Sequence, residues 1–192
     1  MTAAEPPTMQ GQPPPPASGP GTPLAVAAVT VAVIAVTALA VLIQWHSSRN
    51  QKSEEQSAAS PAYLTGTSAR AAEAAAVREV TATLTYNYKT LTADFANAEK
   101  GLTPSFRASY AHTTATSVEP LARKYAAIST ASVSASGVSS ASQSGNAVTV
   151  LVFANQTVQN SQLAHPRLDR TRIQVSMVKL GGMWLIDHLT PL

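Results

Sequence analysis

The sequence predicts an α+β fold in which helices pack on a curved antiparallel sheet, with one membrane-spanning helix before it. Apolar residues recur every three or four positions from Ala76 to Ile128, and then every second position from Ala131 to Leu189. A run without any charge, Leu24 to Ile43, precedes both patterns. Helices followed by strands joined in hairpins are typical of an α+β layer fold.

The composition favours a membrane-associated protein. Of 192 residues, 12% are charged and 5% aromatic, and the formal net charge is +3. The absence of cysteine excludes a disulfide framework, a thiol nucleophile and a Cys-based zinc site. The low charge density argues against nucleic-acid binding, which needs a clustered basic face.

Residues 1–23 are predicted to form a disordered, Pro-rich tail. They hold 8 of the 13 prolines and almost no residues that could build a core. A solvated tail is the simpler interpretation, and a PxxP ligand for a partner is the alternative.

Residues 24–45 are predicted to form a transmembrane helix. The 20 residues from Leu24 to Ile43 contain no charge, Pro, Gly or amide, and at about 1.5 Å each they span about 30 Å, the thickness of the hydrocarbon core of a bilayer. Trp45 lies where an interfacial aromatic anchor is expected. A buried soluble helix is seldom apolar on every side, and a signal peptide would need a cationic start and a cleavage site. Residues 46–68 are polar and small, and we expect them to be a spacer.

Charge alone leaves the orientation of this helix open. Arg49 and Lys52 follow it and would favour a cytoplasmic C-terminal part, but Glu54 and Glu55 come directly afterwards.

The domain is expected to span residues 69–192 and to begin with helices. One apolar stripe runs from Ala76 to Ala98 through Tyr88, with a break predicted near Thr92, which would cap a second piece containing Asp94. Thr103 and Pro104 predict the N-terminus of the next helix. That helix would continue to Ile128, interrupted by a Thr-rich stretch around Ala115 and bent at Glu119–Pro120.

Four strands are expected after the helices, over residues 131–142, 147–158, 171–180 and 183–189. Ser144–Gly145–Asn146 and Gly181–Gly182 predict hairpin turns, and His165–Pro166 predicts a loop.

We find no convergent catalytic or metal-binding set in the sequence. The four histidines are scattered, without the i, i+4 spacing of a metal site. A Tyr88/Asp94 acid–base pair is conceivable, but Tyr88 is better explained as core and Asp94 by a helix start. Asp187 and His188 could likewise be read as an acid–base pair, but a solvated pair at the sheet edge explains them equally well. We therefore expect no enzyme activity and no cofactor.

The densest charge patch comprises Arg167, Arg170 and Arg172, with Asp169 among them. It could contact anionic headgroups or an acidic partner, although a solvated loop-to-strand face is the simpler interpretation. We take these three arginines as the candidate interaction residues.

Six segments carry a family resemblance over residues 70–192. They are residues 86–94 (YNYKTLTAD), 101–106 (GLTPSF) with Tyr110, 136–138 (SGV), 150–156 (VLVFANQ), 168–172 (LDRTR) and 182–186 (GMWLI). In this order, after a Pro-rich tail and one apolar helix, they resemble the actinobacterial Mce-associated membrane proteins. Thr92 departs from the family pattern, which has an Asp there.

The resemblance implies a nuclear-transport-factor-2-like cone, similar to VirB8 periplasmic domains. It also implies a cytoplasmic tail, a single membrane span and an extracytoplasmic domain. The implied function is that of an accessory subunit that assembles or stabilises an Mce-type lipid importer in the cell envelope, with importer subunits as partners. The alternative is a lipid or other small ligand bound in the pocket of the cone.

Overall fold

The computed structural model describes residues 66–192, and its first helix is α3 (Thr67–Leu84). The predicted tail (1–23), membrane span (24–45) and nearly all of the predicted spacer (46–68) lie outside the described residues. Within residues 66–192, no helix combines the length and the hydropathy needed to cross a membrane.

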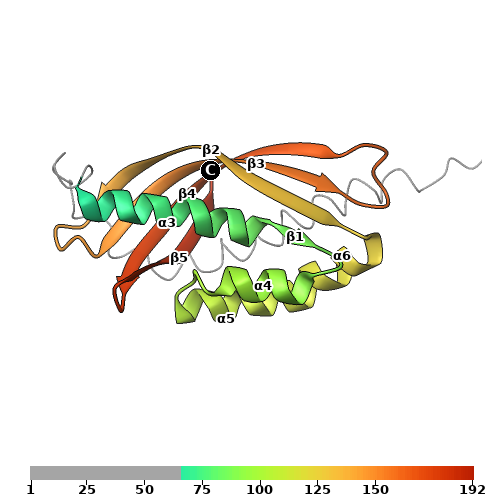
Figure 1. Ribbon diagram of the computed structural model, residues 1–192, viewed down its shortest axis with the longest axis horizontal. Helices are drawn as coiled ribbons and strands as arrows, with labels where there is room; N and C mark the ends of the chain where they lie inside the picture. Colours follow the sequence, from blue (N-terminus) through green and yellow to red (C-terminus); the bar gives the residue numbers. More distant parts are fainter. Residues whose placement is uncertain (1–65) are drawn as a thin grey trace, which may run out of the picture.

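The described chain is an α+β domain built on one five-stranded antiparallel meander, in the order β1-β2-β3-β4-β5 (Figure 1). After α3 come β1 (Tyr86–Asn87), α4 (Leu91–Glu99), α5 (Pro104–Thr113), the π-helical turn η1 (Thr114–Val118) and α6 (Glu119–Tyr125). The strands β2 (Ile128–Ala141), β3 (Ala147–Gln159), β4 (Arg167–Leu180) and β5 (Met183–Pro191) follow. The predicted α+β class, with helices first and hairpin-linked strands second, is confirmed.

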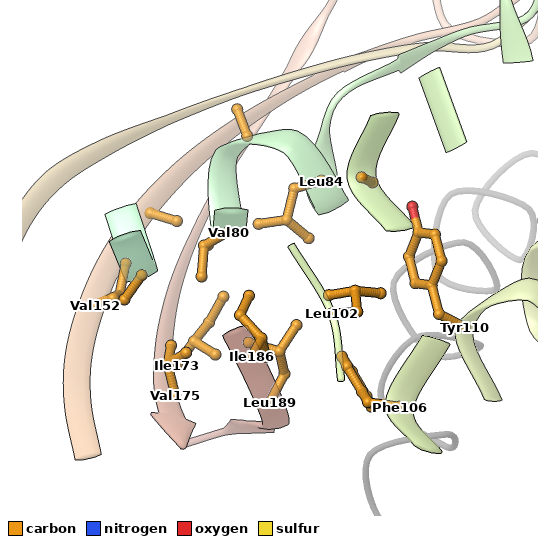
Figure 2. Packing of buried hydrophobic residues seen from close by; sticks show 14 of the residues in the cluster. Val80, Leu84, Leu102, Phe106, Tyr110, Val152, Ile173, Val175, Ile186 and Leu189 are labelled. Atoms are coloured by element: carbon orange, nitrogen blue, oxygen red, sulfur yellow. The ribbon is translucent and has the colours of Figure 1, made fainter. Parts of the chain in front are cut away.

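Helix α3 lies across one face of the sheet, and a second group of helices, α4 to α6, packs beside it (Figure 1). Its sheet-facing stripe consists mainly of alanines, with Val80 and Leu84, and the small side chains bring the helix close to the strands. The opposing strand residues Val152 and Val175 are fully buried (Figure 2), and so is Val150. This inner face of the sheet therefore forms the core of the domain.

The helical stripe predicted through Tyr88 is wrong in its middle part. Helix α3 ends at Leu84, and the chain enters the short strand β1, which pairs with β2 at Tyr86↔Ser129 and Asn87↔Ile128. As a result Tyr86 is buried in the core, whereas Tyr88 lies half-buried in the following turn. Local periodicity cannot reveal this break, because it is stabilised by pairing with a strand about forty positions later.

The start of α4 also differs from the prediction. Thr90, not Thr92, occupies the N-cap position, and Asp94 stands in the first turn as expected. The Asp94 carboxylate accepts hydrogen bonds from the Asn87 amide (2.9 Å) and the Thr90 hydroxyl (2.7 Å). It thereby ties the β1 turn to the helix.

The N-cap prediction at Thr103–Pro104 is confirmed. The Thr103 hydroxyl oxygen accepts a hydrogen bond from the Phe106 amide at 3.3 Å, and Pro104 is the first residue of α5. The Thr-rich stretch forms η1, where the hydroxyl of Thr114 donates to the carbonyl oxygen of Tyr110. Helix α6 ends at Tyr125, so Ile128 belongs to β2 and not, as predicted, to a helix.

The segment between α4 and α5 closes the far edge of the sheet. Leu102 forms a parallel bridge with Ile186 of β5, through hydrogen bonds from the Ile186 amide to the Gly101 carbonyl (2.8 Å) and from the Thr103 amide to the Ile186 carbonyl (2.9 Å). A Cβ atom at Gly101 would overlap the Glu79 side chain of α3, so that flexible side chain would have to move. This bridge connects the second helix group to the sheet.

The strand predictions hold in number and order, with one boundary that matters for function. Gly181 and Gly182 form the predicted turn with φ of 55° and 83°. Strand β4 begins at Arg167, four residues earlier than predicted. The basic segment therefore lies in a paired strand and not in a loop.

Candidate functional site

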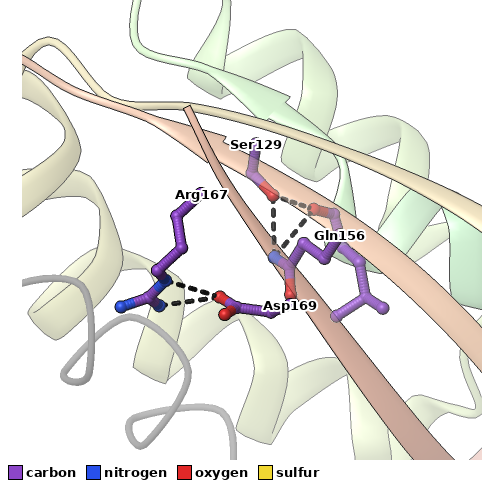
Figure 3. Close-up of polar contacts among 5 residues, drawn as sticks. Ser129, Gln156, Arg167 and Asp169 are labelled. Atoms are coloured by element: carbon purple, nitrogen blue, oxygen red, sulfur yellow. Dashed lines mark hydrogen bonds and ion pairs between the residues drawn. The ribbon is translucent and has the colours of Figure 1, made fainter. Parts of the chain in front are cut away.

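A buried polar cluster joins the C-terminus of α3 to the sheet (Figure 3). The Ser129 hydroxyl donates to the Leu84 carbonyl at 2.6 Å, and the Gln156 amide donates to Ser129 at 2.7 Å and to the same carbonyl at 3.5 Å. Carbonyls at a helix end have no intrahelical partner, so these two side chains satisfy one of them. The cluster is internally satisfied, and we assign it a structural role.

The three candidate arginines do not form one patch. Side chains of successive strand residues point to opposite faces, and β4 begins at the first of the three. Arg167 and Asp169 pair opposite Val158 and Gln156, on the face that carries the core. Their guanidinium and carboxylate groups form an ion pair at 2.7 Å (Figure 3).

Arg170 and Arg172 lie on the opposite side of the sheet, which we call the outer face. Arg172 is directly opposite Phe153 in the β3–β4 register, and Arg170 is opposite Asn155. Directly opposed residues share one face of a sheet with Cβ atoms about 5 Å apart. The outer face thus places Arg172 and the exposed Phe153 at directly opposed positions of neighbouring strands.

The outer face is open and partly apolar. Phe153 is 38% exposed and Leu168 is 53% exposed, and the opposed pair Asn155 and Arg170 lies between them in the β3–β4 register. The neighbouring positions on β2 carry only small residues: Ala135 is opposite Phe153, and Gly137 is opposite Leu151. A Cβ atom added at Gly137 would meet nothing within 4 Å, so this part of the face is open.

The outer face carries two positive charges that no side-chain carboxylate of the described residues neutralises. Arg170 and Arg172 form no ion pair within residues 66–192, and neither interacts with Asp169, which points to the other face. The remaining side-chain carboxylates of this part of the chain belong to α3, α4, α6 and the β5 residue Asp187. The last described residue, Leu192, lies beside Arg172, and its amide donates to the Arg172 carbonyl oxygen at 2.9 Å. Between Lys124 and Arg167 there is no charged residue at all.

Asp187 and His188 are less exposed than a solvated edge pair would be. The carboxylate of Asp187 accepts a hydrogen bond from the Thr103 hydroxyl at 3.0 Å and contacts Nδ1 of His188 at 2.9 Å. The His188 ring stacks on Phe106 with centroids 6.4 Å apart. Thr103 is the third member of this hydrogen-bonded group, and sequence reasoning did not find it because 84 positions separate it from Asp187. The group holds the start of α5 against β5.

The Tyr88/Asp94 pair considered for acid–base chemistry has a structural explanation. The Oδ2 atom of Asp94 accepts two hydrogen bonds, one from the Asn87 main-chain amide and one from the Thr90 hydroxyl. Tyr88 lies in the turn, with the Lys89 ammonium 5.6 Å from its ring centroid. Within the described residues, no three His, Asp or Glu side chains come together as a metal site.

Two tyrosines, both buried in the core, have perturbed ionisation. Burial raises the pKa of Tyr86 above its ordinary value of 10.0. Burial, assisted by the negative charges of Glu99 and Asp94, raises the pKa of Tyr110 still further. Both phenols stay protonated in the folded state when free tyrosine would already ionise.

The domain is expected to lose stability above about pH 10. There the unfolded chain releases phenolic protons that the folded chain retains, so the free energy of unfolding falls as pH rises. Urea unfolding of a 66–192 fragment between pH 8 and 11 measures this loss, which should be smaller in Tyr110→Phe than in the wild-type fragment. Parallel pH curves for the two proteins would contradict the prediction.

The fold resembles that of two solved bacterial domains. It matches an IcmL-like type IV secretion system protein from Legionella pneumophila, with a TM-score of 0.53 and 14% identity, over 62% of this chain and 90% of that one. It also matches the periplasmic domain of DotI with a TM-score of 0.53 and 11% identity, over 67% of this chain and 96% of that one. The mixed helix and antiparallel-sheet domain is therefore of the VirB8-like, NTF2-like type, as the resemblance implied. At these identities the similarity concerns the fold alone.

Sequence relatives then identify the family. The chain is 31% identical to Outer membrane protein Rv1973 of Mycobacterium tuberculosis over 118 residues, covering 62% of this chain and 72% of that protein. It is 34% identical to Uncharacterized protein Rv1362c of the same organism over 123 residues, covering 64% of this chain. The match spans about half of that relative's length, 55%. No family model matches the chain. The chain belongs to the family of Outer membrane protein Rv1973.

Proposed function

We propose that the protein is a membrane-anchored accessory subunit that assembles or stabilises an Mce-type lipid importer in the cell envelope. The span at residues 24–45 would anchor it, with residues 1–23 in the cytoplasm and the domain outside. No catalytic role is proposed, because the polar groups described above are explained by caps and by contacts between elements. The relationship to a mycobacterial protein named for the outer membrane supports an envelope location.

The observation that carries this proposal is the unpaired outer face. It combines exposed Phe153 and Leu168 with Arg170 and Arg172, whereas the inner face is filled by packing against α3. Exposed apolar side chains rimmed by polar ones mark surfaces where proteins meet. Anchoring would hold this surface near membrane partners and so raise their effective concentration.

The relatives in fold support a role in a complex. The two solved neighbours are a type IV secretion system protein and a periplasmic domain, and both share the layout of helices on one antiparallel sheet. For this chain we infer an equivalent use of the domain: contact with other subunits on the outer side of the membrane. Subunits of the importer are the proposed partners.

Affinity purification of the tagged full-length protein from its native membrane tests the proposal. Co-purification of substrate-binding subunits or a permease of a lipid importer is the expected result. A variant that lacks residues 24–45 should lose these partners although the domain still folds. Recovery of the protein alone, in detergents that keep known importers intact, would contradict the assignment.

Labelling tests the proposed topology independently. The chain has no cysteine, so Ser144→Cys in the β2–β3 turn gives a single exposed thiol. Reaction with an impermeant maleimide in intact cells is expected, and labelling only after lysis would place the domain inside.

A further inference from the structure

We propose that the outer face docks an acidic segment of a partner protein, through carboxylates that pair with Arg170 and Arg172 and an apolar side chain that contacts Phe153. This inference deepens the proposed function and rests on it, because it names the chemistry of the partner.

The charge of the face is complementary to an anion. Arg170 and Arg172 are both exposed, and in the part of the chain that the structure describes no side-chain carboxylate lies on the outer side of β2, β3 or β4. By contrast, Arg167, three residues before Arg170 and on the opposite face, is already paired with Asp169. The strand therefore presents two guanidinium groups to the outside and a closed ion pair to the inside.

The geometry sets the spacing of the partner's carboxylates. Residues two apart on a strand lie about 7 Å from each other on the same face. Arginine forms planar, two-point hydrogen bonds with carboxylates, and such pairs fix both register and orientation. A segment with carboxylates on alternate residues of an extended chain, or three to four residues apart on a helix, matches this spacing.

Because part of the outer face is apolar, the partner should also contribute an apolar side chain that packs against it. Phe153 lies opposite Arg172 on one side and Ala135 on the other, so its ring projects above the small residues of β2. Leu151 is half-buried beside it and faces Gly137. An aromatic ring next to arginine, with a surrounding surface of low charge, is typical of the centre of a protein interface.

A lipid surface fits these observations less well. A basic residue near an anionic bilayer contributes only about 1 kcal/mol, and stable binding by charge uses clusters of four to eight such residues. The outer face has two, with none on β2 or β3. A protein partner with fixed carboxylates uses two arginines more effectively.

The test is a photocrosslink in the full-length chain in its native membrane. p-Benzoylphenylalanine replaces Phe153, the membranes are irradiated, and mass spectrometry identifies the adducts and the peptide attached. We expect an adduct with another protein, at a segment that carries at least two carboxylates in the spacing given above.

Charge reversal then decides whether the arginines make the contact. Arg170→Glu with Arg172→Glu should lower the adduct yield by more than about tenfold, since like charges are then opposed. Replacing the partner's carboxylates with arginine should restore it. The matched control is Arg70→Glu with Arg78→Glu on α3, which makes the same change in net charge at exposed positions away from the face and should leave the yield unchanged.

Folding of the variants is checked by thermal unfolding, and Arg170→Gln with Arg172→Gln is the milder substitute, for which an intermediate loss is expected. The proposal is overturned by adducts with lipid only, with a second copy of this chain only, or with no partner. It is also overturned by a yield that charge reversal does not change. A charge-dependent partner outside any lipid importer would uphold this inference and refute the proposed function, whereas importer subunits that co-purify without an arginine-dependent adduct would do the reverse.

Discussion

Replacing Tyr110 by alanine is expected to lower the free energy of unfolding by about 3–5 kcal/mol, the largest effect of any single truncation in the domain. Tyr110 is 1% exposed, and its ring packs edge-on against Phe95 with centroids 6.2 Å apart. Phe95 in turn contacts Tyr86 of β1 at 6.0 Å. Loss of the Tyr110 ring therefore opens a cavity where α4, α5 and β1 meet.

Tyr110→Phe separates the ring from the hydroxyl. The hydroxyl donates to the Thr83 carbonyl at 3.4 Å, a long hydrogen bond, so its removal should cost about 1 kcal/mol or less. Urea unfolding of the 66–192 fragment provides both values. Equal losses in the two variants would mean that the hydroxyl, and not the packed ring, carries the stability.

Ile186→Ala is the second substitution with a large expected effect, about 2–5 kcal/mol. Ile186 is fully buried on β5, and its backbone forms both hydrogen bonds that bind the α4–α5 segment to the sheet. The truncation leaves those bonds in place but removes the packing beneath them. Leu168→Ala is the matched control, because Leu168 is 53% exposed on the outer face, and it should change stability by less than about 0.5 kcal/mol.

Amide hydrogen exchange measures the effect of Ile186→Ala locally, at the bridge between Leu102 and β5. The Thr103 and Ile186 amides should exchange faster in the variant, since the bridge loses its packed support. Unchanged exchange at these amides, together with a normal unfolding midpoint, would show that the bridge is held by the backbone alone.

The candidate site was predictable in residue type but not in arrangement. The arginines at 167, 170 and 172 stood out as the densest charge patch, yet the predicted strand began at Thr171, which left the orientation of the Arg167 and Arg170 side chains undefined. The alternation of Leu168, Arg170 and Arg172 against Arg167 and Asp169 was present in the sequence as a period of two. That signal would have divided the patch between two faces. The contribution of Phe153 required the β3–β4 register, which no local pattern supplies.

The sequence by itself determined those features that depend on neighbouring residues. Thr103 followed by Pro104 caps a helix because the hydroxyl reaches an amide three positions later. Gly181–Gly182 forms a tight turn because glycine adopts positive φ without a steric cost. Strand alternation and the helical stripe within α3 likewise follow from side-chain periodicity.

The tertiary structure alone decided the features that depend on distant residues. The chain leaves the helical stripe after Leu84 because β1 pairs with β2 and Ser129 binds the last turn of α3, so Tyr86 and not Tyr88 enters the core. Arg170 and Arg172 are set apart from Arg167 because β4 pairs with β3 along its whole length. In both cases the deciding hydrogen bonds join segments far apart in the chain, and their free energy is not contained in either segment alone.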